Sequence, residues 1–139
     1  MKTVVVDASV WVSAILPDEP NHATSQAWVD RWRRDGNQFA QPSIFVTEVG
    51  CAIGRRRQYA TLATPAVADI LVDGSIEFIA VDRAIAESAA DIGIPSKLRG
   101  ADAIYVALAK QRGIPIVTWD NEILSSASKV GVTARVPTV

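Results

Sequence analysis

The chain has 139 residues, of which 49% are hydrophobic and 21% are charged, and its formal net charge is −1. This composition predicts one compact domain covering residues 1–139, and it excludes a disordered chain. The sequence shows no signal-peptide pattern and no apolar run of the ~20 residues that cross a bilayer, so we expect a cytoplasmic protein.

The sequence contains few side chains that could bind a metal ion through sulfur or nitrogen. Cys51 is the only cysteine and His22 the only histidine, so an intrachain disulfide, a thiolate cluster and a multi-histidine zinc site are all excluded. Any bound metal must take oxygen ligands, which favours Mg²⁺ or Mn²⁺ over zinc or copper. The balanced charge means that contact with a nucleic acid would have to rely on local basic patches.

In the first half of the chain, apolar runs alternate with helical patterns. Residues 3–6 predict a buried strand, followed by helices at 9–16 and 22–35 and a second strand at 38–40. A third helix is expected to begin near Pro42 or Ser43 and to run through Glu48 toward Gln58. A fourth begins at Pro65 and ends near 73–74.

The second half continues the alternation. Strands are expected at 76–81, at 116–118 and, along one edge of the sheet, at 132–136. Helices are expected at 82–92, ended by Gly93 and Pro95, at 101–112 and at 122–129. The pattern predicts a three-layer α/β/α fold with a central, mostly parallel sheet of about five strands.

Acidic residues recur where the predicted strands end. Asp7 follows the first strand and Asp120 follows the strand at 116–118, so both are expected at the carboxyl edge of a parallel sheet, where open α/β sheets bind ligands. Asp102 lies in the first turn of a helix, and Glu48 lies inside a mostly apolar helix. Taken alone, Asp7 is better explained as a turn or capping residue.

Carboxylates gathered in one cleft repel each other by about 1 kcal/mol per pair at 4 Å in water, or about 4 kcal/mol at an effective dielectric constant of 20. A divalent cation would remove this repulsion. Clustering of these acids would therefore predict a metal site.

Four features together resemble a known family. They are the opening "VVVDASVW", the stretch "PSIFVTEVGCAIGR" at 42–55, the stretch "LRGADAIYVALAKQRGIPIVTWD" at 98–120, and the spacing between them. The chain resembles the PIN domain, in particular the short VapC-type toxins of toxin–antitoxin pairs. The resemblance implies a PIN-like fold, a ribonuclease dependent on Mg²⁺ or Mn²⁺, a VapB-like antitoxin as partner, an RNA substrate and a homodimer.

Carried over by position, the family's acidic metal-binding and catalytic set falls on Asp7, Glu48, Asp102 and Asp120. Ser9 and Thr118 match the hydroxyl positions that flank the site. Two positions depart from the pattern. Many relatives carry Asn where this chain has Cys51, and some carry a further acid where it has Asn121, so the resemblance supports one metal ion more strongly than two.

The expected roles follow from metal-dependent phosphodiester hydrolysis. Asp7, Asp102 and Asp120 would ligate the ion directly or through its waters, and Glu48 would either ligate it or accept a proton from the attacking water. Ser9 and Thr118 would orient the carboxylates, with helix capping as the alternative for Ser9.

Basic residues near these acids have two interpretations. Lys97 and Arg99 are candidate RNA phosphate contacts, with a solvated loop as the alternative. The arginines at 55–57 are expected to interact with the end of the third helix. Asp82 also follows a strand, but it is predicted to be a helix cap.

Other functions are less well matched by the sequence. A phosphoacceptor domain would need a second acid near Asp7 and a lysine after a late strand, and a phosphatase with an Asp nucleophile would need an Asp at Ser9. The alternatives within the resemblance are a PIN nuclease of general RNA processing without an antitoxin, and a non-catalytic PIN-like binding module.

Overall fold

The computed structural model describes residues 1–138, so the end of the predicted domain at residue 139 lies outside the described residues. The five strands are β1 (Thr3–Val6), β2 (Gln38–Pro42), β3 (Ile76–Ile79), β4 (Ile116–Val117) and β5 (Ala134–Arg135). The α-helices are α1 (Ala8–Ile15), α2 (His22–Arg34), α3 (Ile44–Gly54), α4 (Ala63–Leu71), α5 (Arg83–Ser96), α6 (Gly100–Arg112) and α7 (Asn121–Ala127). There are also two 3₁₀ helices among the described residues. The first, η1 (Arg57–Leu62), lies between α3 and α4 in the chain, and the second, η2 (Ser128–Val130), follows α7.

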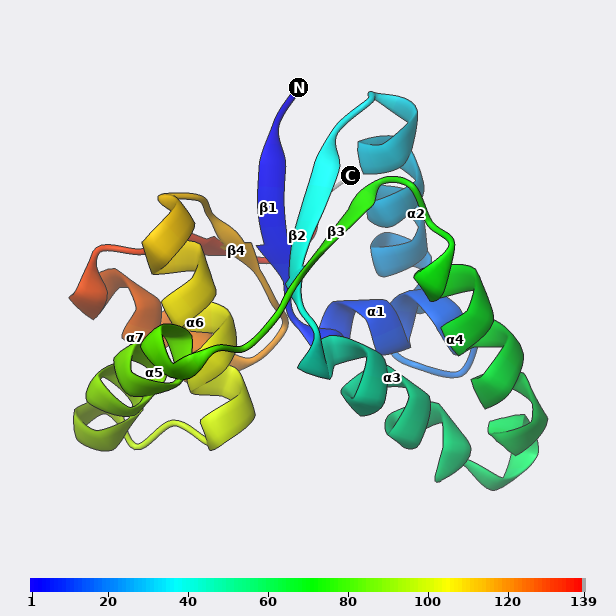
Figure 1. Ribbon diagram of the computed structural model, residues 1–139. Coiled ribbons are helices and arrows are strands. Elements are labelled where there is room, and N and C mark those ends of the chain that lie inside the picture. The colour runs from blue at the N-terminus through cyan, green and yellow to red at the C-terminus, as the bar shows by residue number, and fades with distance from the viewer. Residues whose placement is uncertain (139) are drawn as a thin grey trace.

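The strands form one parallel sheet in the order β3-β2-β1-β4-β5. Figure 1 shows α1 to α4 gathered on one side of this sheet and α5 to α7 on the other. The predicted three-layer α/β/α fold is therefore confirmed, with all strand pairs parallel. Within residues 1–138, no helix is long and apolar enough to cross a membrane.

The central strand β1 is covered on both faces. Val4, Val5 and Val6 are buried, as expected for a strand in the middle of a parallel sheet. On one side they join a core that includes Trp11 of α1 and Phe39 of β2. The continuous apolar run in the sequence is thus explained by burial from both layers.

Gln41 completes the hydrogen bonding between β1 and β2 at their carboxyl ends. The two backbones pair at Val4 and Phe39, and beyond this point the buried Gln41 side chain takes over. Its Oε1 accepts from the Val6 N–H at 2.8 Å, and its Nε2 donates to the Val6 carbonyl at 2.7 Å. An amide side chain therefore satisfies the backbone of β1 beside the carboxyl edge.

The prediction that Gly93 and Pro95 end the fifth helix is wrong, because α5 continues to Ser96. Gly93 is buried against α6, and a Cβ at this position would lie 2.9 Å from the Cβ of Ala103. The glycine permits close packing of α5 on α6. Pro95 lies in the last turn, and the helix ends at Lys97, which has a left-handed backbone with φ of 56°.

The predicted extension of the third helix toward Gln58 is also wrong. Helix α3 ends at Gly54, and Arg56 has an extended backbone that leads into η1. The Arg56 guanidinium binds Glu19 at 2.8 Å and also Asp18, both in the α1–α2 connection. These tertiary ion pairs thus stabilise an extended backbone at a position where the local sequence would allow the helix to continue. The remaining predicted boundaries differ from the observed ones by a few residues at each end.

Candidate active site

The site lies where the strand order of the sheet reverses. From β1 the chain proceeds outward to β2 and β3, whereas β4 and β5 lie on the other side of β1. Asp7 directly follows β1, and Thr118 to Asp120 follow the neighbouring β4. The crevice outside such a switch point is the usual ligand site of an open α/β sheet.

All four acids singled out in the sequence line one cleft with a volume of about 630 Å³. Asp7 comes from the β1–α1 junction, Glu48 from α3, Asp102 from the first turn of α6 and Asp120 from the start of α7. Segments that are far apart in the sequence therefore contribute one carboxylate each. The remaining lining residues are Ala8, Ser9, Val12, Glu19, Thr47, Cys51, Ala52, Arg55 and Arg99.

Two hydroxyl groups fix the Asp7 carboxylate. Ser9 Oγ donates to Asp7 Oδ2 at 2.6 Å and accepts from the Trp119 N–H at 3.2 Å. Thr118 Oγ1 donates to the same oxygen at 2.9 Å and accepts from the Asp120 N–H at 2.9 Å. Each hydroxyl joins Asp7 to the loop after β4, so the sheet edge and this loop are held in one geometry. The N-cap position of α1 is Asp7 and not Ser9, whose hydroxyl makes these two bonds.

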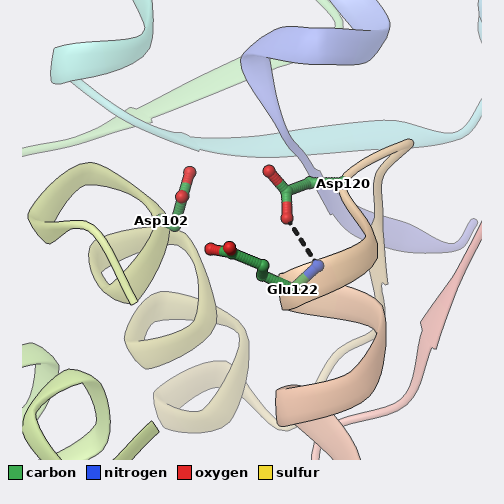
Figure 2. Close-up of side chains that lie close together, drawn as sticks. All are labelled: Asp102, Asp120 and Glu122. Atoms are coloured by element: carbon green, nitrogen blue, oxygen red, sulfur yellow. Dashed lines mark hydrogen bonds between the residues drawn. The ribbon is translucent and has the colours of Figure 1, made fainter. Parts of the chain in front are cut away.

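Asp120 is held by the helix that it begins. Its Oδ1 accepts from the N–H groups of Glu122 at 2.8 Å and Ile123 at 3.0 Å. Figure 2 shows Asp102, Asp120 and Glu122 close together between α6 and α7, with the bond from the Glu122 N–H to Asp120 dashed. One oxygen from each of these three acids lies within 4.8 Å of the others.

Glu122 was not predicted as a site residue. The family pattern places a further acid at the position of Asn121, but the first turn of α7 brings the acid two residues beyond Asp120 to the cluster instead. The signal was available, because an acid at this spacing from a capping Asp points back toward the helix start.

Glu48 contributes a carboxylate with an unused oxygen. Its Oε1 is buried and has no hydrogen-bond partner among the described residues. The neighbouring residues of α3 are apolar, with Phe45 and Val49 fully buried. A buried carboxylate oxygen without a partner is costly, so it marks a place where the protein on its own leaves a charge uncompensated.

Burial and the neighbouring charges raise the pKa values of three acids of the cleft. The pKa of Asp102 rises to about 6, through burial first and then through Asp7 and Asp120, while Arg99 opposes the shift. Burial also raises the pKa of Asp7, against the opposing hydrogen bonds from Ser9 and Thr118. The pKa of Glu48 is raised by burial and by the charge of Asp7. The cleft therefore concentrates negative charge that no neighbouring cation neutralises fully.

The residues present fit a divalent cation with oxygen ligands. Carboxylates from four elements converge, and the buried Glu48 Oε1 lacks any partner. Neutralisation by a cation would also remove the mutual repulsion that raises the pKa of Asp102. This donor set is the one preferred by hard cations such as Mg²⁺ and Mn²⁺.

The structure distributes the basic residues differently from the sequence expectation. Arg99 lines the cleft and lies 3.8 Å from Asp102, whereas Lys97 is not among the lining residues. Arg55, expected to interact only with the end of its helix, lines the opposite wall. Its neighbour Arg56 is engaged by Asp18 and Glu19. Asp82 caps α5 by accepting from the Ile85 N–H at 2.9 Å, as predicted.

Comparisons with solved structures agree with this fold. The chain is similar to the sarcin–ricin loop cleaving toxin VapC20 of Mycobacterium tuberculosis, with 18% identity, coverage of 94% of this chain and 96% of that chain, and a TM-score of 0.75. It is also similar to FitAcB of Neisseria gonorrhoeae, with 21% identity, coverage of 96% and 97%, and a TM-score of 0.72. VapBC2 of Rickettsia felis, bound to a promoter DNA fragment, is similar with 11% identity, coverage of 96% of this chain and 98% of that chain, and a TM-score of 0.70.

A search of the curated proteins gave no match. The family model described as PIN domain, in contrast, matches residues 4–129. This range contains Asp7, Glu48, Asp102, Asp120 and Glu122. The chain belongs to the PIN domain family.

Proposed function

We propose that this protein is a metal-dependent endoribonuclease and the toxin of a type II toxin–antitoxin system. The observation that carries the proposal is the convergence of Asp7, Glu48, Asp102 and Asp120 in one cleft at the switch point of the sheet. Membership of the PIN domain family supports a hydrolase that acts on RNA. The likeness to VapC20, which is described as an RNA-cleaving toxin, supports the toxin role.

In this proposal, Asp7, Glu48, Asp102 and Asp120 would hold a Mg²⁺ or Mn²⁺ ion. The bound ion would supply charge stabilisation at the scissile phosphate and an activated water. Asp7 is kept in position by the hydroxyls of Ser9 and Thr118. Glu122 would add a further carboxylate beside Asp102 and Asp120.

The proposed role of Glu48 is to present one carboxylate oxygen to the cleft, either as a ligand or as the acceptor of the proton from the attacking water. Arg55 and Arg99 would contact RNA phosphates from opposite walls of the cleft. Arg55 replaces Lys97 in this role, because Lys97 does not line the cleft.

The proposed protein partner is a VapB-like antitoxin. Several similar structures are complexes of this kind: VapBC2 bound to promoter DNA, a DNA-bound VapBC of Salmonella typhimurium and a toxin–antitoxin complex of Klebsiella pneumoniae. The proposed substrate places the activity in the cytoplasm. The homodimer expected from the resemblance stays a prediction.

The test is cleavage of a labelled total-RNA pool by the purified protein with Mg²⁺, with Mn²⁺ and with EDTA. Asp7→Asn removes a carboxylate from the cleft, and Asp82→Asn changes an acid at a helix cap away from it. We expect cutting by the wild type and by Asp82→Asn only with metal, and none by Asp7→Asn.

Full activity of Asp7→Asn would overturn the assignment of the site. Absence of cutting under every condition, together with absence of metal binding by calorimetry, would favour a non-catalytic binding module. Co-expression with the gene adjacent to the coding sequence tests the toxin role, because an antitoxin should restore growth that the protein alone arrests.

A further inference from the structure

Three buried side-chain atoms within residues 1–138 lack a hydrogen-bond partner: Trp11 Nε1, Glu48 Oε1 and the Tyr105 hydroxyl. Such groups are rare in folded proteins, because each loses its bonds to water without replacement. Two of the three, on Glu48 and Tyr105, lie close enough to influence each other's pKa, although they do not meet hydrogen-bond geometry. The pair therefore forms a local feature that the apolar core does not explain.

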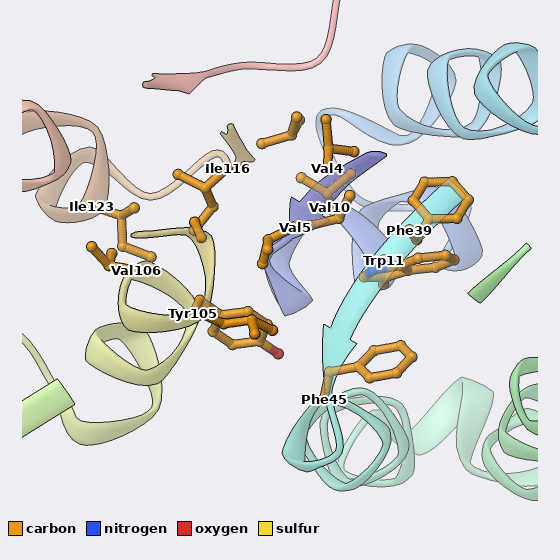
Figure 3. Close-up of a cluster of buried hydrophobic side chains, with 14 of the residues drawn as sticks. Val4, Val5, Val10, Trp11, Phe39, Phe45, Tyr105, Val106, Ile116 and Ile123 are labelled. Carbon is orange, nitrogen blue, oxygen red and sulfur yellow. The ribbon is translucent and has the colours of Figure 1, made fainter. Parts of the chain in front are cut away.

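Tyr105 lies in α6, three residues after Asp102, so both project from the same side of the helix. Its side chain is completely buried, and Figure 3 shows it among the core side chains with its hydroxyl pointing away from α6. A phenylalanine would fill this space without placing a hydroxyl in the core. The hydroxyl therefore requires a reason other than packing.

The groups around the Tyr105 hydroxyl determine which hydrogen bonds it can donate and accept. It lies near the Glu48 carboxylate and near the backbone N–H of Ala8, the first residue of α1. A carboxylate only accepts hydrogen bonds and a backbone N–H only donates them, whereas a phenol does both. Neither bond is formed at hydrogen-bond geometry in this structure, but a small approach of these groups would let the Ala8 N–H donate to the tyrosine oxygen and the tyrosine O–H donate to Glu48.

We propose that Tyr105 is a positioning residue that holds Glu48 Oε1 from behind, so that the other oxygen of Glu48 faces the metal site in a fixed direction. This inference rests on the proposed metal-dependent function. Glu48 stands on α3, which is separate from the β1, α6 and α7 segments that carry the other three acids of the cleft. Hydrogen bonds behind a ligating carboxylate commonly control its orientation and its affinity for metal.

The primary test is Mn²⁺ binding measured by calorimetry on the full chain. Tyr105→Phe removes only the hydroxyl and should raise the dissociation constant for Mn²⁺ about 10–100-fold. Tyr59→Phe is the matched control, because Tyr59 is the second of the two tyrosines and does not line the cleft. In a Glu48→Gln background, adding Tyr105→Phe should change the dissociation constant much less than it does in the wild type.

A second measurement needs no change at Tyr105. With tyrosine labelled at Cζ, NMR should give two signals, and Tyr59→Phe identifies the one from Tyr105. Titration with Mg²⁺ should shift the Tyr105 signal in the wild type, and the shift should be strongly reduced in Glu48→Gln. A merely structural tyrosine would show no dependence on Glu48.

The outcomes separate this inference from the proposed function. Equal Mn²⁺ affinity in wild type and Tyr105→Phe, or a Tyr105 signal that is unchanged by Mg²⁺ in a protein that binds the ion, overturns the positioning role alone. Absence of metal binding by the wild type overturns both. Should Tyr105→Phe fail to fold, the NMR comparison of wild type and Glu48→Gln decides the question.

Discussion

An aromatic layer formed by residues of α1, α2 and β2 differs from the acidic cleft in how its charged groups are compensated. In the aromatic layer, the rings of Trp11 and Phe39 lie 5.0 Å apart, and Trp28 stacks on Trp32 at 5.4 Å. Arg33 lies over the Trp11 ring and binds Asp73 at 2.7 Å. In the cleft, several carboxylates line one opening.

Two aspartates, one in each region, show this difference in their pKa values. Although burial opposes it, hydrogen bonds from Ser75 and the charge of Arg33 lower the pKa of Asp73. The pKa of Asp102 instead rises to about 6, because burial and neighbouring acids both disfavour its charged form. The aromatic layer is thus arranged for stability, and the cleft keeps a charge arrangement that reduces the stability of the free protein.

The largest loss of stability should follow Phe39→Ala. Phe39 is fully buried and packs against Trp11, Trp28 and Trp32, so truncation leaves a cavity that rigid rings cannot fill. We expect the free energy of unfolding to fall by about 3–5 kcal/mol, measured by urea denaturation. RNA cleavage per folded molecule should persist at low temperature. A loss below about 1 kcal/mol would mean that this layer is not the stabilising core.

Asp102→Asn should increase the stability of the metal-free protein. Removing one charge from the cluster relieves repulsion, and a pKa of about 6 against an unfolded value of 3.8 sets the gain for the metal-free protein at up to about 3 kcal/mol near neutral pH. RNA cleavage should fall by more than about 100-fold, because even residues behind metal ligands contribute 10–100-fold. A destabilised Asp102→Asn in EDTA would contradict the charge-crowding account.

The metal-free protein should become more stable as the pH falls from about 7.5 to about 5. The raised pKa of Asp102 means that the folded state binds the proton more tightly than the unfolded state does. The destabilising charge is therefore fully present above pH 6 and disappears as the pH falls toward 3.8. The midpoint of thermal unfolding in EDTA measures this, and Asp102→Asn should flatten the trend.

The two adjacent arginines should differ in their effect on RNA binding. Arg55 lines the cleft, whereas Arg56 is engaged by Asp18 and Glu19. Arg55→Ala should weaken binding of RNA to an inactive Asp7→Asn protein and reduce the salt dependence by about one phosphate contact. Arg56→Ala should keep the salt slope of the parent. Equal slopes for both variants would show that Arg55 makes no phosphate contact.

The smallest effect should come from Asp82→Asn. Asp82 caps α5 by accepting from the Ile85 N–H, and asparagine caps helices about as well as aspartate. We expect the free energy of unfolding to change by less than about 0.5 kcal/mol and RNA cleavage to stay at the wild-type rate. Loss of cleavage in this variant would mean that the active surface extends beyond the cleft.

Much of the fold was predictable, because local patterns carry it. Three consecutive valines indicate a strand buried on both faces, and alternation with helical periodicity indicates parallel connections. The positions of Asp7 and Asp120 also followed, since Asp7 comes directly after β1 and Asp120 lies three residues beyond the end of β4, at the same edge of the sheet. The structure brings these two together with Glu48 and Asp102, as the resemblance to the PIN domain implied.

Other features depended on contacts between distant segments. Gly93 follows the usual pattern of a helix stop, yet its role is to let α5 approach Ala103 of α6. Arg55 and Arg56 are equivalent in the sequence, and only the position of the α1–α2 connection engages one and leaves the other in the cleft. Local propensity contains no information about such partners.

Residue type and short-range periodicity were enough to predict the order of strands and helices, the acids at the strand ends and the oxygen-only ligand set. The packed fold was needed to show that Gln41 completes the bonding of Val6, that Glu122 joins Asp102 and Asp120, and that Tyr105 lies near Glu48. These pairings depend on where a side chain points after helices and strands have packed. That direction is set by close packing across the whole core.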